Sequence, residues 1–387
     1  MKFKIFLIFM LIQKLILYIS YYFFKFLIVR IKKDQWVIGV DEMASMIYLL
    51  GKTVTPSKTI SLSNNPFYKL PYDYHIPISS KIISYLVRGI YGPILLGYLT
   101  NKSNLFWYIW SSGFLLDRDF EFKFLKSKNK KIVCMFVGDD IRVPRLMTSF
   151  CKENDLDTFI DYVGEKNPYY LSDTYHNKKK KTAQSADKYA DVIFSASICQ
   201  KSFIQKKQYF TPYMYDKKLF NFNPNKFKNI DRLKILHAPS NPFVKGTALV
   251  RAAVKKLRME GYDFEYLELR NVTNIEVLEH LKSTHIVLNQ FYAFLPGVFG
   301  IEGMANHCAV LQSANPDIET GLPQDDHGAW LVTGYWEIYD NIKYLMDNPE
   351  KIELYANNGY QYVCKYHTFE ASSEYIRSVL KENGIIY

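Results

Sequence analysis

The sequence predicts an α/β fold with two doubly wound domains that face each other across a cleft, preceded by an apolar helix. Three observations predict it. Apolar strand-like runs alternate with amphipathic helical stretches in both halves of the 387-residue chain, as in parallel sheets built from βαβ units. A stretch with many Asn residues, two Pro residues and no periodicity, 209–232, separates the halves. Residues 5–24 are almost wholly apolar.

The chain length and this seam divide the sequence into four segments. A length of 387 residues suffices for two or three domains. We expect residues 1–33 to form a membrane-associated helix, 34–222 an N-terminal domain and 223–366 a C-terminal domain. Residues 367–387 should form a last helix that packs back toward the N-terminal domain.

In the first half, the expected strands are short apolar runs bounded by turn formers. They are WVIGV (36–40), KTISLS (58–63), LFWYIW (105–110), KKIVCMFV (130–137) and DVIFSAS (191–197). Helices are expected from an N-cap at Asp41 to about Gly51, over 78–92, over 119–129 and just before the last strand. The run NKKKKT (177–182) is expected to be an exposed loop, with a phosphoglycan or membrane contact as the alternative.

The second half repeats the alternation of strands and helices. Strands are expected at LKILHAP (233–239), FEYLEL (264–269), HIVLNQ (285–290) and AVLQS (309–313). Helices are expected at 247–261, 274–283, 301–308, 336–367 with a Pro break, and 369–384. Ligands of such sheets bind outside the carboxyl ends of the strands, so a site is expected in the loops there.

Charge and cysteine content narrow the function classes. The formal net charge is +11 and the sequence pI is about 9.1, which favours anionic partners. The sequence contains no helix-turn-helix or RNA-binding motif, so nucleic acid is not an expected partner. The five Cys residues show neither a CxxC nor a Cys/His spacing, so neither a zinc site nor a disulfide framework is predicted.

The N-terminal segment has three interpretations. Twenty apolar residues can span a bilayer, and a central Lys14 costs only about 2.5–3.5 kcal/mol against the gain from many apolar side chains. Alternatively, four lysines (Lys4, Lys14, Lys25 and Lys32) lie on one stripe of a single helix, which suits an interfacial helix on anionic lipid. A helix packed into the core is the third. Both membrane interpretations keep the body of the protein in the cytoplasm, because the basic run 28–33 follows the apolar segment.

The stretch HAPSNPFVKGT (237–247) predicts an anion-binding corner. It joins a strand to a helix, and backbone N–H groups at a helix start favour an anion. Lys245 adds a positive charge, and Ser240 and Asn241 add neutral donors. The GxxxxGK[ST] pattern of a Walker loop is absent. The alternative is a solvated Lys245 beside a turn formed by Gly246.

The stretch FLPGVFGIEGMANHCAVL (294–311) predicts a second binding element. Gly297 and Gly300 allow the backbone to approach a ligand. Glu302 is expected in the first turn of a helix, where the helix dipole favours a carboxylate that accepts two hydrogen bonds from vicinal hydroxyls. The alternative is a glutamate that only caps the helix.

In this order and spacing, the two stretches resemble the donor-binding domain of retaining GT-B glycosyltransferases, family 4, also called group 1. STHIVLNQ (283–290) and NPEKIELYANNGYQYVCKYH (348–367) extend the resemblance over about 185–370. The resemblance implies two facing Rossmann-like domains and a nucleotide-sugar donor held by the second one. Lys245 would hold the diphosphate and Glu302 the ribose. The remaining donor-binding residues would be His237, Ser240, Asn241, Gly246, Gly297, Val298, Phe299, Gly300 and Ile301.

The first half resembles the same family more loosely, over NLFWYIW to VGDDIR (104–142). Asp139, Asp140 and Arg142 follow a strand and would face the cleft. Asp140 would hydrogen-bond or deprotonate an acceptor hydroxyl, and Arg142 would bind an anionic acceptor or the leaving phosphate. An Asp–Arg pair that fixes the loop is the alternative. Asp41 and Glu42 lie where the family has acceptor and donor loops, with helix capping as the alternative.

Together these features predict a retaining glycosyltransferase at the cytoplasmic face of the plasma membrane, attached peripherally or by one N-terminal anchor. It would transfer a sugar from a nucleoside diphosphate sugar to a hydroxyl of a lipid-linked or cell-surface glycan acceptor. Asp140, Arg142 and Lys245 would be catalytic, Asp41, Glu42 and Asp139 acceptor-binding, and neither a metal nor a cofactor is expected. Phe294, Ser240 and Val137 stand where the family usually has Glu, Arg and His. These departures motivate the alternative of a non-catalytic nucleotide-sugar-binding or scaffold subunit.

Overall fold

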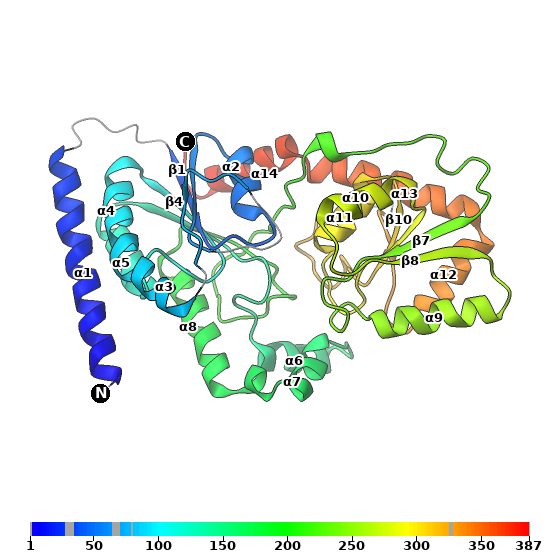
Figure 1. Cartoon of the computed structure of the whole chain (residues 1–387), viewed down its shortest axis with the longest axis horizontal. Helices are drawn as coiled ribbons and strands as arrows, with labels where there is room; N and C mark the ends of the chain where they lie inside the picture. The colour runs from blue at the N-terminus through cyan, green and yellow to red at the C-terminus, as the bar shows by residue number, and fades with distance from the viewer. Residues whose placement is uncertain (1, 28–34, 64–69, 79, 325–327, 387) are drawn as a thin grey trace.

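A computed structural model describes residues 2–27, 35–63, 70–78, 80–324 and 328–386. Within these residues the chain forms two parallel sheets flanked by helices, with one long helix, α1, at the outer edge of the first sheet's domain (Figure 1). The predicted fold class is therefore confirmed.

The first sheet has six strands in the order β3-β2-β1-β4-β5-β6, and its strand pairs are parallel. The strands are β1 (Trp36–Val40), β2 (Ser57–Ser61), β3 (Tyr74–His75), β4 (Leu105–Ile109), β5 (Lys131–Met135) and β6 (Val192–Phe194). This order is that of a doubly wound dinucleotide-binding sheet. The buried runs WVIGV and LFWYI form neighbouring central strands, because side chains there are covered on both faces.

Helices cover both faces of the first sheet. The helical segments of this half are α2 (Met46–Thr53), α3 (Lys81–Leu86), the π-helical turn η1 (Val87–Tyr91), α4 (Gly92–Lys102), α5 (Arg118–Ser127), α6 (Pro144–Glu153), α7 (Phe159–Lys166), the 3₁₀ turn η2 (Pro168–Leu171) and α8 (Asp173–Tyr189). Of these, α6 and α7 pack with the loops after β6 and β9 instead of on the sheet. The core on one face joins α4, α5 and α8, and the core on the other face joins α2 to the last helix, α14 (Phe369–Glu382).

Two predictions in the first half were wrong. The helix expected at 78–92 continues as α4 to Lys102, and NKKKKT lies within α8 instead of an exposed loop. The polar α8 is stable because Ser172 accepts a hydrogen bond from the backbone N–H of Tyr175 at its start, while Ala183 and Ala186 are buried in the core. Periodicity also gave no indication of α6 and α7.

The second sheet has five parallel strands in the order β11-β10-β9-β7-β8. They are β7 (Leu233–His237), β8 (Phe264–Glu268), β9 (Ile286–Leu288), β10 (Ala309–Gln312) and β11 (Leu331–Val332). One face is covered by α10 (Asn274–Ser283), α11 (Gly297–Ala305) and α13 (Pro349–Tyr366), and the other by α9 (Thr247–Met259) and α12 (Ile338–Asp347). The four strands predicted in this half are confirmed.

The chain crosses between the two domains twice. The stretch 209–232, which contains the short 3₁₀ turn η3 (Lys217–Leu219), leads from the first sheet to the second, and α13 leads back to α14. The two crossings meet where the backbone N–H of Tyr215 donates to the carbonyl of His367 over 2.7 Å. Ile376 and Val379 of α14 are buried in the core of the first sheet.

Helix α1 (Lys2–Leu27) lies beside α4 and runs parallel to it (Figure 1). The side chains of Gln13, Leu17 and Ser20 are buried in this contact. Gly97 of α4 lies so close that an added Cβ would be 2.8 Å from the backbone N of Tyr21. The helix is therefore a packed part of the first domain, with one side turned outward.

Candidate functional site

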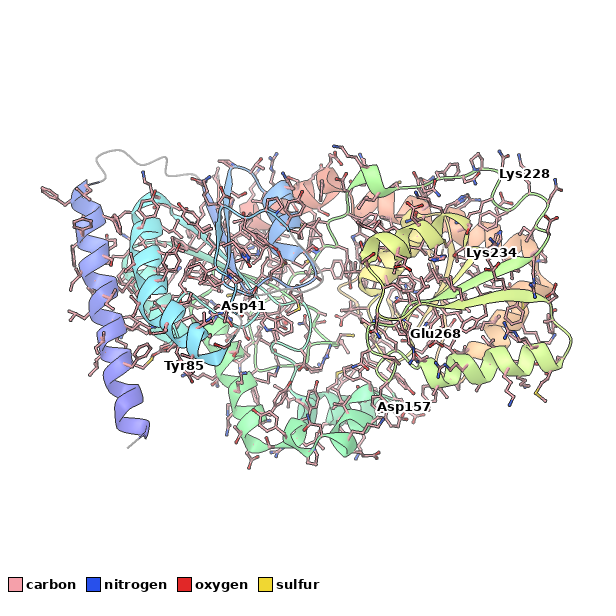
Figure 2. The ribbon with its side chains drawn as sticks, in the orientation of Figure 1. Asp41, Tyr85, Asp157, Lys228, Lys234 and Glu268 are labelled. Carbon is pink, nitrogen blue, oxygen red and sulfur yellow. The ribbon has the colours of Figure 1, made fainter. Side chains whose placement is uncertain are left out.

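The loops that follow the strands of the two sheets meet between the domains. The backbone N–H of Phe294, after β9, donates to Sγ of Cys199, after β6, over 3.1 Å. Tyr162 of α7 packs its ring 5.6 Å from that of Tyr292. The hydroxyl of Tyr335 donates over 2.6 Å to Asp157, which lies between α6 and α7 and is labelled in Figure 2. The carboxyl ends of both sheets thus surround one region, where a parallel α/β fold binds its ligands.

The loop after β7 owes its shape to Asn241 and Gly246. The Asn241 Oδ1 accepts hydrogen bonds from the backbone N–H groups of Phe243 and Val244 at 3.2 and 3.3 Å, which closes a tight turn. Gly246 has φ of +75° and precedes α9, a conformation that favours glycine. The N–H groups of Lys245, Gly246 and Thr247 donate to carbonyls of the same loop. The Lys245 ammonium is therefore the group that this loop offers to an anion.

Lys245 is half-buried and bonded to a residue that the sequence analysis did not single out. Its Nζ donates to Oε1 of Gln290, directly after β9. The Gln290 Nε2 donates in turn to the carbonyl of Leu295 over 2.5 Å, so this amide ties the lysine loop to the glycine loop. Burial lowers the pKa of Lys245 to about 8, because desolvation disfavours the charged ammonium. A bound anion would offset this desolvation penalty and raise the pKa of Lys245 again.

The ring of His237 is turned into the core, and its predicted contact with the donor stays a prediction. It is fully buried. Its Nδ1 lies 2.7 Å from the carbonyl of Leu288 and its Nε2 2.8 Å from Oγ1 of Thr247. Burial lowers its pKa to about 4, so the ring is neutral at pH 7 and joins β7, β9 and α9. Ser240 and Asn241 are exposed beside Lys245, although the Asn241 carbonyl oxygens are used within the loop.

The predicted glycine element forms the start of α11. Gly297 has φ of +66°, and its N–H donates to the hydroxyl of Tyr213 over 3.1 Å. Val298 and Phe299 are half-buried. Gly300 and Ile301 are buried, and their predicted contact with the donor stays a prediction. A Cβ at Gly300 would lie 2.5 Å from Oε1 of Gln312, so this glycine is required by packing.

Glu302 lies in the second turn of α11 rather than the first, because the helix begins at Gly297. The residue is only 6% exposed, and its Oε1 accepts a hydrogen bond from Nδ2 of Asn274 over 2.8 Å. Burial raises the pKa of Glu302 to about 7, partly offset by the Asn274 amide. Asn274 opens α10, and no local pattern links it to Glu302.

Asp140 holds the loop after β5 through its carboxylate, and its predicted catalytic role stays a prediction. The residue is only 2% exposed. It accepts hydrogen bonds from the backbone N–H groups of Val137, Gly138 and Ile141 and from Nε2 of Gln200, at 2.9–3.3 Å. Burial raises its pKa to about 6 although these N–H groups oppose the shift. Its neighbours Asp139 and Arg142 form an ion pair at 3.7 Å. This pair supports the alternative in which an Asp–Arg pair fixes the loop.

Asp139 and Arg142 belong to a polar network that includes Lys179. The Asp139 carboxylate accepts hydrogen bonds from the hydroxyls of Tyr170 and Tyr175 and from Nζ of Lys179. Nε of Arg142 donates to the carbonyl of Cys199 over 2.5 Å. Lys179 comes from the run expected to be a loop, and its burial was not evident from sequence because its neighbours in that run are also lysines.

The loop after β1 places the two remaining predicted residues. Asp41 pairs with Arg88 of η1 at 2.6 Å. Glu42 is buried and accepts hydrogen bonds from the backbone N–H groups of Ile47 and Tyr48 and from the hydroxyl of Tyr72. Glu42, rather than Asp41, therefore caps α2, and the capping alternative is supported for it. Asp41 is partly exposed.

Glu319 joins the two domains and was missed by the sequence analysis. It is fully buried in the loop after β10. Its carboxylate accepts hydrogen bonds from the backbone N–H groups of Ser197, Ile198 and Cys199 and from the Ser197 hydroxyl, at 2.7–2.9 Å. These donors come from a turn more than a hundred residues away in the sequence. The same turn contacts Arg142, so Glu319 couples the second domain to the loop after β5.

Replacing Glu319 with glutamine is expected to destabilise the chain by about 2–4 kcal/mol, because an amide would set an N–H group against buried N–H donors and remove a charged acceptor. Urea denaturation checks the stability, and small-angle scattering checks the separation of the domains. Asp317→Asn is the matched control, since Asp317 is exposed two positions earlier. Equal stability of both variants would show that Glu319 does not couple the domains.

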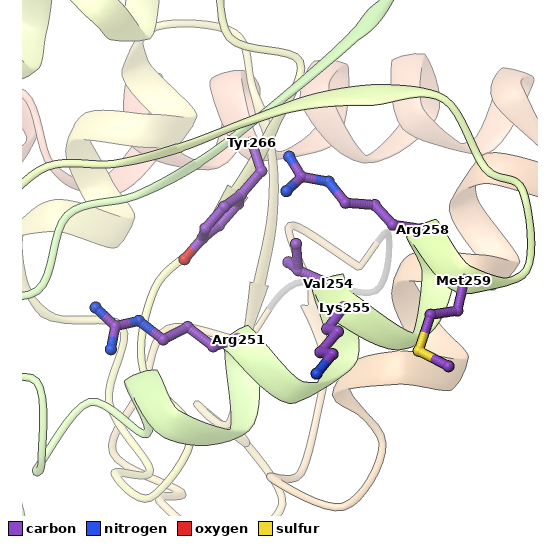
Figure 3. Close-up of a pocket in the computed structure, with 6 residues that line it drawn as sticks. All are labelled: Arg251, Val254, Lys255, Arg258, Met259 and Tyr266. Carbon is purple, nitrogen blue, oxygen red and sulfur yellow. The ribbon is translucent and has the colours of Figure 1, made fainter.

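The surface pocket in Figure 3 is separate from these loops. It has a volume of about 370 Å³ and is lined by Arg251, Val254, Lys255, Arg258, Met259 and Tyr266. Arg251 is already paired with Glu268 at 2.8 Å. None of the predicted site residues lines this pocket. In the described part of the chain, no group of three or more His, Cys, Asp and Glu side chains is arranged to hold a metal ion, and metal independence stays a prediction.

Comparison with solved structures identifies the fold. Sucrose-phosphate synthase from Thermosynechococcus elongatus superposes with a TM-score of 0.59 and 11% identity, over 91% of this chain and 99% of that chain. HepE from Anabaena in complex with UDP-glucose superposes with a TM-score of 0.55 and 11% identity, over 90% and 99%. A UDP-N-acetylglucosamine 2-epimerase from Listeria monocytogenes gives 0.52 and 12%, over 91% and 97%.

These structures share the arrangement of both domains with this chain, which therefore has the GT-B fold of two Rossmann-like domains. At these identities the likeness concerns the fold alone. Neither a protein-family model nor a curated protein sequence matches the chain.

Proposed function

We propose that this chain is a glycosyltransferase that moves a sugar from a nucleoside diphosphate sugar to a hydroxyl of a lipid-linked or cell-surface glycan acceptor. The observation that carries the proposal is the pairing of Lys245 with Gln290, which fixes an ammonium between the loops after β7 and β9, beside the helix that bears Glu302. In a GT-B fold this is the carboxyl edge of the second sheet. Structural neighbours with the same fold were solved with UDP and UDP-glucose.

Lys245 and Glu302 would divide the recognition of the donor. The ammonium of Lys245 would leave Gln290 for the diphosphate and stabilise the charge that develops on the leaving group. The Glu302 carboxylate would accept hydrogen bonds from the ribose hydroxyls, with Asn274 keeping it in place. The half-buried Val298 and Phe299 at the start of α11 would border the phosphates or the sugar.

We further propose that the anomeric configuration is retained and that no side chain of the loop after β5 takes the acceptor proton. The Asp140 carboxylate is occupied by four donors, so the leaving diphosphate is the better proton acceptor. Asp140 would be a positioning residue that shapes the loop, and Asp139 and Arg142 would border the acceptor. Catalysis would then depend on orientation and on charge stabilisation by Lys245, without a metal.

A panel of nucleotide sugars tests the proposal. The purified chain is titrated with UDP-, GDP-, ADP-, dTDP- and CMP-sugars by thermal shift, and the best binder is then incubated with lipid-linked and glycan acceptors. Transfer of the sugar is expected. Binding without any conversion would support a non-catalytic subunit, and conversion of the donor to an isomer without acceptor would identify an epimerase. No binding by the whole panel would overturn the proposal.

Donor affinity should depend on pH with a maximum between about 7 and about 8. Glu302 must be ionised to accept two hydroxyl hydrogen bonds, so affinity rises as pH increases through its pKa of about 7. Lys245 must be protonated to bind the diphosphate, so affinity falls above its pKa of about 8. Isothermal titration with UDP-glucose from pH 5.5 to 9 checks this. Lys245→Arg should remove only the alkaline decline, and a wild-type profile in that variant would exclude Lys245 as its origin.

A further inference from the structure

Two adjacent helical segments of the first domain expose an unusually large apolar surface. The structure exposes 27 large apolar side chains among its described residues, and 15 of them lie in α1 or in the segment Ile82–Ile94. Those of α1 are Leu11, Ile12, Leu15, Tyr18, Ile19, Tyr22, Phe23, Phe26 and Leu27, and those of the second segment are Ile82, Ile83, Tyr85, Leu86, Ile90 and Ile94. We call these side chains the apolar face. A soluble monomer rarely leaves so much contiguous apolar surface in water.

The two parts of the apolar face are fixed to each other. The Gln13 side chain donates from Nε2 to the carbonyl of Arg88 over 2.5 Å, and Asn101 donates from Nδ2 to the carbonyl of Tyr21 over 2.9 Å. The second segment continues from α3 through η1 into α4, which runs beside α1 (Figure 1), and Tyr85 marks its first part in Figure 2. Both stretches are long and apolar enough to cross a membrane, over Phe9–Leu27 and Ile82–Lys102.

Packing argues against a membrane-spanning α1. A helix that left the domain to span a bilayer would give up the hydrogen bonds of Gln13 and Tyr21 and would expose the buried Ser20 to lipid. It would also separate Lys14 from the Phe120 ring of α5, above which its ammonium lies at 4.4 Å. Polar side chains without partners in hydrocarbon are costly. In the packed position Nε2 of Gln13 and the carbonyl of Tyr21 keep their hydrogen bonds, and the exposed side chains of α1 between Leu11 and Leu27 are apolar except for Lys25.

The charged residues around the apolar face indicate what kind of surface it binds. Residues 1–33 contain seven Lys or Arg residues and no Asp or Glu, and residues 76–102 contain three and none. Lys128, directly after α5, adds an ammonium over the ring of Tyr21, at the edge of the same face. An apolar surface whose own two segments carry positive charges and no negative ones matches the surface of an anionic lipid leaflet.

We infer that α1 and Ile82–Ile94 together insert into one leaflet of an anionic membrane, and that α1 does not cross it. Membrane insertion itself is independent of the proposed function. Only the statement that the acceptor is a lipid-linked glycan rests on that function. Arg88 is buried in η1, and its guanidinium pairs with Asp41 after β1 at 2.6 Å and donates to the carbonyl of Gly113. The predicted acceptor loop is therefore connected to the membrane-inserting segment through one side chain, an arrangement suited to an acceptor that stays anchored in the leaflet.

Vesicle binding of the full chain tests the inference without any sugar substrate. Cosedimentation uses vesicles of phosphatidylglycerol and phosphatidylethanolamine. The variant Ile82→Glu/Leu86→Glu, which leaves α1 unchanged, is expected to bind at least tenfold more weakly than wild type. Met259→Glu/Ile275→Glu is the matched control, because these side chains are similarly exposed on the second domain and should bind as wild type does. Folding of each variant is checked by its thermal midpoint.

Three results would overturn the inference. Wild-type vesicle binding by Ile82→Glu/Leu86→Glu would show that α1 anchors the chain alone. Equal binding to vesicles of pure phosphatidylcholine would remove the role of charge. The variant could also lose self-association, measured by light scattering, while wild type self-associates and does not bind vesicles. That result would assign the apolar face to a second copy of the chain. If the chain binds vesicles but does not transfer the sugar from the donor, the result would count against the proposed function alone.

The position of the N-terminus tests the one-leaflet arrangement directly. An epitope tag before Met1 of the full chain should stay protected from protease added to the outside of spheroplasts, because α1 remains on the cytoplasmic side. A helix that spans the membrane would expose the tag to cleavage. Exposure of the tag would therefore overturn the inference even if the vesicle experiment succeeded.

Discussion

Lys245→Ala is expected to lower kcat/KM for sugar transfer by about 10²–10³-fold, the range measured when one group that stabilises a developing negative charge is removed. Lys245 is the single charged residue of the loop 238–246, and the stretch 289–300 has none. No neighbouring cation in these two loops can replace it. The effect should appear in the affinity for the nucleoside diphosphate as well as in turnover, because the same ammonium binds the donor and stabilises the leaving group.

Two controls separate this role from a general loss of stability. Lys255→Ala removes an exposed lysine from α9, the helix that follows the loop of Lys245, and should leave sugar transfer unchanged. Gln290→Leu should weaken donor binding less than Lys245→Ala, because it frees the ammonium without removing its charge. The assignment of the diphosphate to this corner is wrong if Lys245→Ala binds UDP as tightly as Lys255→Ala does.

Glu302→Ala is expected to weaken donor binding by about 10–100-fold, since hydrogen bonds to a charged group contribute about 1.5–3 kcal/mol. The loss should depend on the ribose. Wild type is expected to prefer a ribonucleoside diphosphate over its 2′-deoxy analogue, and Glu302→Ala should bind both with similar, low affinity. Isothermal titration of the two ligands against the two proteins measures the coupling between the carboxylate and the hydroxyl.

The control for Glu302 is Glu276→Ala, which removes an exposed carboxylate from α10 and should keep the preference for ribose. Asn274→Ala should lower the affinity to an intermediate extent, because Asn274 holds one oxygen of Glu302 and would not touch the ligand itself. If Glu302→Ala still discriminates between the two ligands as wild type does, Glu302 has only a structural role in α11.

The sequence predicted the elements that hold the site better than the contacts within it. WVIGV and LFWYIW formed strands because their apolar side chains are buried on both faces of a parallel sheet. Lys245 and Glu302 were recognised because each lies next to glycines at a strand-to-helix connection. The first part of helix α8 was missed, although its end before β6 was predicted, because its 17 residues are mostly polar and its burial pattern involves few apolar positions.

Several site residues needed the folded chain to be understood. Asp140 is acidic and follows a strand, which locally favours a catalytic interpretation, but Gln200 and three backbone N–H groups occupy its carboxylate. His237 has the right position beside the loop, but its ring points into the core. Local sequence gives the residue type and the strand end, while the direction of the side chain depends on what packs against it.

The sequence by itself determined the alternation of strands and helices in both halves, the apolar N-terminal segment and the two residues on which the proposed donor site depends, but not α6, α7, β3 or β11. These are set by short-range periodicity and turn chemistry, which are written in neighbouring residues. The tertiary structure alone decided that α1 packs beside α4, that Glu319 joins the domains and that Gln290 holds Lys245. Each of these contacts joins residues at least 45 positions apart in the sequence, and such pairs come together only when burial of the whole core repays the loss of chain entropy.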